Sequence, residues 1–151
     1  MFVTAVKNKV FSNPSAELLK KIHGEGAECR EITEAEFRQA RTLMGSPDVL
    51  YAWEGTVILG NTVANIAAIE KIRQFERVNR QLQAVDRAAG MGRAGRGLAV
   101  ATAKKNSVTG HVSEKGSDLE ILEAFEAEAE TLRAQISALT NEISAAVRDA
   151  V

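Results

Sequence analysis

Residues 118–150 read DLEILEAFEAEAETLRAQISALTNEISAAVRDA, and their apolar residues recur at alternating spacings of three and four. This heptad pattern is typical of a helix that packs along one seam against another helix. Ser117 and Glu120 form an S-x-x-E capping box, so we expect the helix to occupy residues 117–151. The seam residues, which we take as candidate oligomerisation residues, are Leu122, Phe125, Ala129, Leu132, Ile136, Leu139, Ile143 and Ala146, followed by Ala150.

The seam leaves two partners open. Isoleucine at a positions with leucine at d positions favours a parallel two-stranded coiled coil. Alanine dilutes the seam at Ala129, Ala146 and Ala150, which weakens that specification. An intrachain hairpin onto an upstream helix is therefore an equal alternative to a homo-oligomer.

The upstream helix is expected over residues 48–89, beginning between Pro47 and Gly60. Gly90 is suited to end it in the left-handed conformation. Four arginines lie off its apolar face and form a basic side, namely Arg73, Arg77, Arg80 and Arg87. The apolar face itself follows a helical period through Ile66, Ile69, Ile72, Phe75, Val78, Leu82, Val85 and Ala89.

Residues 90–116 are expected to form a Gly/Arg-rich hinge and a polar loop between the two long helices. The string Gly90-x-Gly92-x-x-Gly95 matches a dinucleotide fingerprint only in letters, because no strand precedes it and no βαβ unit surrounds it. No aromatic residue lies between Phe75 and Phe125, so any nucleic-acid contact should be non-specific. The candidate anion or nucleic-acid contacts are Arg93, Arg96, Lys104 and Lys105.

Residues 1–47 are expected to form a small N-terminal helical region. One helix runs through Leu18, Leu19 and Ile22 and stops near Gly24, with His23 in the loop. A second helix begins at a Thr33/Glu36 capping box and ends at Gly45-Ser46-Pro47. Residues 1–10 are compatible with either a strand or an extended arm.

Charge is segregated along the 151 residues: the net is −2 for residues 1–70, +7 for residues 71–115 and −6 for residues 116–151. The basic middle and the acidic end are expected to attract each other, within a chain or between chains, over distances limited by salt to about 10 Å.

No residue pattern predicts catalysis, a cofactor or a metal. Cys29 is the only cysteine, and His23 and His111 lack partners at metal-ligand spacing. We expect no signal peptide, and the apolar stretch at 57–69 is shorter than the ~20 residues that span a bilayer. Tyr51 and Trp53 beside it have interfacial character, although a buried core helix is the favoured interpretation. We therefore expect a non-enzymatic, cytoplasmic protein or one carried in a particle assembled there.

The layout from Gly60 onward resembles the internal virion (ejection) proteins of short-tailed bacteriophages. The matching features are an alanine-rich helix with Asn61, Asn65 and Ala67-Ala68, a small-residue segment from Arg87 to Gly97, and a Gly116-Ser117-Asp118-Leu119 turn that opens the last helix at Leu122. The first 50 residues are outside the resemblance, and residues 104–114 depart from it. It implies a virion component that oligomerises, contacts other virion proteins and touches the envelope transiently during DNA ejection. A neck or capsid accessory protein would share this character.

The sequence thus predicts a mostly α fold and a structural protein that assembles through long helices, with itself and other virion proteins as partners. The alternative is a small cytosolic helical module that binds a partner protein or nucleic acid through Arg73–Lys105. Salt separates the two, since nucleic-acid binding weakens steeply with salt and an apolar seam is nearly indifferent.

Overall fold

The computed structural model describes residues 1–93, 105–106, 108–109 and 118–150. The chain divides into two compact units. Residues 1–72 and 142–151 make up one, here called the α/β unit, and residues 73–141 make up the other, called the helical unit. The described residues are mostly helical, as predicted, but they also form two small sheets that the predicted fold does not contain.

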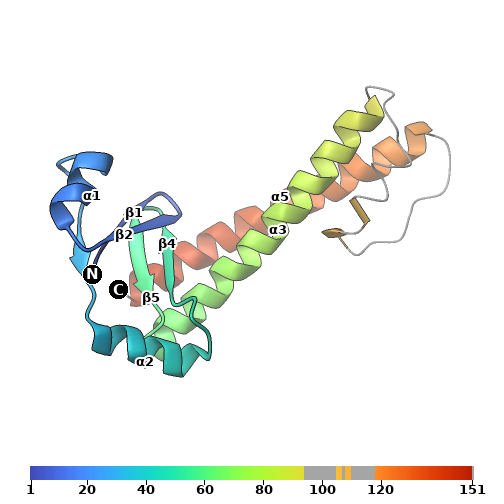
Figure 1. Ribbon diagram of the computed structural model, residues 1–151. Helices are drawn as coiled ribbons and strands as arrows, with labels where there is room; N and C mark the ends of the chain where they lie inside the picture. The colour runs from blue at the N-terminus through green and yellow to red at the C-terminus, as the bar shows by residue number, and fades with distance from the viewer. Residues whose placement is uncertain (94–104, 107, 110–117, 151) are drawn as a thin grey trace. The chain divides into compact units, whose positions relative to one another are not determined.

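The strands of the α/β unit form two hairpins, with one short strand added to the first (Figure 1). The antiparallel strands β1 (Phe2–Val6) and β2 (Lys9–Asn13) form the first, and β3 (Arg30–Glu31) joins the other side of β1. Residues 1–10 are thus strands and their turn rather than an extended arm. The second hairpin pairs β4 (Leu50–Trp53) with β5 (Thr56–Leu59).

The second hairpin corrects the predicted start of the long helix. Glu54 and Gly55 both have positive φ, 46° and 82°, which is the geometry of a tight two-residue hairpin turn. Thr56, Val57 and Ile58 that follow are β-branched and favour strand over helix. The apolar run at 57–59 therefore belongs to a strand, and helix α3 (Val63–Arg93) begins only after it.

The two hairpins are tied together at their turns. Gly55 N donates to Lys7 O at 2.7 Å, and Glu54 N donates to the side-chain oxygen of Asn8 at 2.9 Å. Both bonds join residues more than 40 positions apart in the sequence, so neither is visible in a local pattern.

Two short helices begin and end close to the capping residues that the sequence predicts. Helix α1 (Ala16–His23) begins at Ser15, whose hydroxyl accepts a bond from Leu18 N, and Gly24 follows its end. His23, which was predicted to lie in the loop, is the last residue of this helix. Helix α2 (Glu34–Met44) ends at Gly45 in the left-handed conformation.

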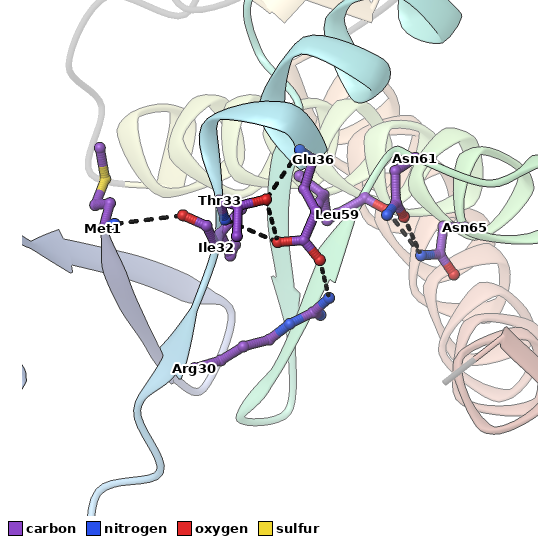
Figure 2. Close-up of polar contacts among 8 residues, drawn as sticks. All are labelled: Met1, Arg30, Ile32, Thr33, Glu36, Leu59, Asn61 and Asn65. Carbon is purple, nitrogen blue, oxygen red and sulfur yellow. Dashed lines mark hydrogen bonds and ion pairs between the residues drawn. The ribbon is translucent and has the colours of Figure 1, made fainter.

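The capping box of α2 forms as expected (Figure 2). Thr33 N donates to Glu36 Oε2 at 2.8 Å, and Glu36 N donates to Thr33 Oγ1 at 3.2 Å. The backbone bond from Thr33 lowers the pKa of the Glu36 carboxyl below its usual value, with smaller help from the Thr33 hydroxyl and Arg30. The box thus prefers the ionised glutamate.

The core of the α/β unit gathers apolar side chains from several elements. Helix α5 (Asp118–Ala150) contributes its last turns, where Ser144 Oγ accepts a bond from Trp53 Nε1 at 3.1 Å. Lys71 of α3 pairs with Glu142 of α5 at 3.4 Å. The buried cluster at the centre comprises Val3, Ile32, Phe37, Ala40, Val49 and Leu59.

An asparagine pair connects β5 to the start of α3 (Figure 2). Asn65 is buried, and its side-chain amide donates to Leu59 O at 2.8 Å and to Asn61 Oδ1 at 3.3 Å. Asn65 N donates to Thr62 Oγ1 at 3.1 Å, so the Thr62 hydroxyl caps the start of α3. These polar residues therefore serve to start α3 at the end of the hairpin.

The helical unit pairs α3 from Arg73 onward with α5 up to Asn141, and the two helices run in opposite directions (Figure 1). Arg133 of α5 pairs with Asp86 of α3 at 3.0 Å. Their buried apolar residues are Val78, Val85, Ala88 and Ala89 on α3 and Phe125, Ala129, Leu132 and Leu139 on α5.

Candidate functional site

The heptad seam of α5 is buried within a single chain. In the helical unit Phe125, Ala129, Leu132 and Leu139 are at most 6 % exposed, and in the α/β unit Ile143 is fully buried. Leu122, Ile136 and Ala146 are half-buried. The two long helices of the single chain form the hairpin that the sequence allows, and they bury these residues without a second copy.

Lys105 is the only one of the four candidate anion contacts whose side chain is described, and it is not at the surface. Its ammonium lies 3.0 Å from Glu128 Oε2 and 4.5 Å from the centre of the Phe125 ring. The side chain is fully buried. Arg93 is the last residue of α3, and Arg96 and Lys104 lie outside the described residues. The positive charge of Lys105 is therefore balanced inside the helical unit.

The predicted basic side of α3 is present and largely exposed. Arg77, Arg80 and Arg87 are exposed and form no ion pair or hydrogen bond with the part of the chain that the structure describes. Arg73 is half-buried and has a partner. Arg77, Arg80 and Arg87 line a cavity of about 600 Å³ in the helical unit. The other described lining residues are Gln81, Gln83, Ala84, Ala88, Met91, Lys105 and Val108. The sequence marked the arginines, but nothing in it showed the cavity.

Three large apolar side chains are exposed on two adjacent elements of the α/β unit. They are Phe11 on β2 and Leu18 and Ile22 on α1, which are 36 %, 47 % and 68 % exposed. Leu18 and Ile22 lie one turn apart on the same helix face, and Leu19 of that helix faces the interior. The ring of Phe11 lies 4.3 Å from that of His23, which anchors β2 to the end of α1. We call these three residues the α1 patch.

Cys29 lies beside a second cavity of about 590 Å³ in the α/β unit. The half-buried thiol is 3.8 Å from Ala27 O and 3.9 Å from Ala16 O. Its neighbours in the cavity wall include Lys20 and Arg30. These two contacts with carbonyl oxygens indicate that Cys29 serves packing and weak hydrogen bonding.

Gly90 lies inside α3 and does not end it. The described glycines with positive φ are Gly24, Gly45 and Gly55, so the predicted left-handed stop at Gly90 is wrong. The helix continues through Met91 to Arg93, which carries the apolar wall of the larger cavity one turn further. The remaining residues of the predicted hinge are mostly outside the described ranges.

Across the described ranges, no three His, Cys, Asp or Glu side chains are placed to hold a metal ion. None of the described helices has the length and apolar character needed to cross a membrane. No known protein family, no curated protein and no solved structure matches the chain.

Proposed function

We propose that this protein is a non-enzymatic assembly protein that self-associates through the α1 patch. The observation that carries the proposal is the exposure of three large apolar side chains together on one small unit. Contiguous apolar surface on a soluble domain typically marks a contact with another protein. The α5 seam, already buried by α3, is a poor contact for a second chain.

A second copy of the chain is the simplest occupant of the patch. In a two-fold dimer the same surface meets itself, so Phe11, Leu18 and Ile22 of each copy cover those of the other. The resemblance to ejection proteins supports a short-tailed phage virion as the setting, with assembly in the cytoplasm and other virion proteins as further partners.

Sedimentation velocity on the full chain tests self-association. We expect the wild type to form dimers or larger species and Leu18→Glu/Ile22→Glu to be monomeric. Glutamate at position 18 stands three residues after the Ser15 cap, where it favours the helix start, so the variant should keep α1. Circular dichroism checks that its helix content is unchanged.

A matched control places the same two charges elsewhere. Leu43 and Val63 are 50 % and 81 % exposed and lie outside the patch, so Leu43→Glu/Val63→Glu should assemble like the wild type. A wild-type chain that stays monomeric at high concentration, or a patch variant with unchanged mass, would overturn the proposal.

A further inference from the structure

Three exposed arginines of α3 form a row along one side of the helix. Arg77, Arg80 and Arg87 are separated by three and seven residues, which places them on the same side of the helix. At 1.5 Å per residue the row is about 15 Å long. Ala84 and Met91 continue the same side, and both line the cavity beside the row.

Among the described residues, these three arginines form no ion pair, unlike other cations of the helical unit. Lys105 pairs with Glu128, and Arg133 pairs with Asp86, the residue next to Arg87. None of the described residues that line the cavity is a carboxylate. Residues 71–115 carry a net charge of +7, so the row lies in the most basic segment of the sequence.

The cavity beside the row combines this charge with apolar walls. Ala84, Ala88, Met91 and Val108 provide aliphatic surface within its volume of about 600 Å³. Guanidinium planes bind phosphate with paired hydrogen bonds and can also stack on nucleobases. A row of charge next to apolar walls suits a ligand in which phosphates alternate with flat rings.

We propose that this row and cavity bind single-stranded nucleic acid along its backbone, without sequence preference. A strand offers a phosphate line for the three guanidinium groups and unpaired bases for the apolar walls. An acidic protein segment would satisfy the charges but has no such rings for the cavity. The site goes beyond self-association and does not depend on the α1 patch.

Fluorescence anisotropy with a labelled oligothymidylate of about 20 nucleotides tests the site. The full-length chain should bind it at about 50 mM salt and lose affinity steeply by about 200 mM. Arg77→Gln/Arg80→Gln/Arg87→Gln should bind at least tenfold more weakly. Because single strands contribute about 0.7 to the salt slope per neutralised phosphate, losing three contacts should flatten the slope by about two.

Two further variants test whether binding depends on net charge alone or on the position and shape of the three guanidinium groups. Lys9→Gln/Lys21→Gln/Arg38→Gln removes the same net charge from exposed positions of the α/β unit and should bind like the wild type. Arg77→Lys/Arg80→Lys/Arg87→Lys should keep the salt slope but bind severalfold more weakly, because lysine cannot make the paired bonds. This variant also provides the test if the glutamine variant does not fold.

Three results would overturn the inference. The first is equal loss of binding in the α/β-unit control, and the second is tighter binding of a duplex of the same length. The third is displacement of the oligonucleotide by polyglutamate as readily as by unlabelled oligothymidylate, which would assign the row to an acidic protein partner.

Discussion

At the scale of single residues, Gly60 lies so close to the Met44 side chain that an added Cβ atom would force a neighbour to shift. It follows β5 and is buried, and a Cβ atom built on it would overlap Met44 Sδ of α2 and approach Ile69 Cδ1 to 3.3 Å. This close approach, and not a positive φ, is the structural reason that favours glycine at this position. A glycine in the sequence does not show whether close packing or a positive φ is the reason for it.

We expect Gly60→Ala to destabilise the α/β unit by about 1–3 kcal/mol, as overpacking does. In a Met44→Ala background only Ile69 Cδ1 still lies close, at 3.3 Å, so the same change should become nearly neutral or stabilise by up to about 1 kcal/mol through the unfolded chain. Urea denaturation of the four chains measures this reversal. Equal effects in both backgrounds would show that Met44 is not the obstacle.

At the scale of elements, the ends of helices followed their caps where a cap has a distinct chemistry. Ser15 and the Thr33/Glu36 box mark two starts, and Gly45 marks one end. Gly90 failed as a marker, because a glycine within a helix and a glycine after one look alike in sequence. An exposed helix interior tolerates it at a cost of about 1 kcal/mol.

This difference makes Gly90→Ala a direct test of the helix end. No described atom lies within 4 Å of the added Cβ, so the change should stabilise the chain by about 0.5–1 kcal/mol. Gly45→Ala, at φ 63°, should instead cost about 1–2 kcal/mol, because only glycine adopts the left-handed conformation without strain. Thermal melts compare the two. A loss of stability in Gly90→Ala would contradict the continuous helix.

The β4–β5 hairpin was missed for a related reason. Its apolar residues are too few to separate an alternation of two from a helical period, and the run continues into the apolar face of α3. Glu54-Gly55 was the available turn signal, and the β-branched residues after it were the second. Both are local, so this part of the fold was open to prediction.

At the scale of the whole molecule, the intrachain seam has a measurable consequence. Ile143 is fully buried in the α/β unit, so Ile143→Ala should cost about 2–5 kcal/mol. Ser137→Ala, at an exposed position of the same helix, should be nearly neutral. Urea denaturation in the Leu18→Glu/Ile22→Glu background measures both without association at the α1 patch.

The loss caused by Ile143→Ala should be the same at two protein concentrations tenfold apart. A seam between chains would instead make stability depend on concentration, because association is then part of folding. A midpoint that rises with concentration in this background would restore the interchain coiled coil.

The sequence by itself determined the mostly helical character, the two long helices, the capped ends of α1 and α2 and the basic side of α3. Each depends on periodicity or on residues within a turn of one another, and such local chemistry is visible in a single chain. Tertiary structure alone decided which helix covers the seam, that Lys105 pairs with Glu128, and that a cavity lies beside Arg77, Arg80 and Arg87. A heptad seam buries equally well against any complementary helix, so its pattern encodes the need for a partner but not the partner's identity.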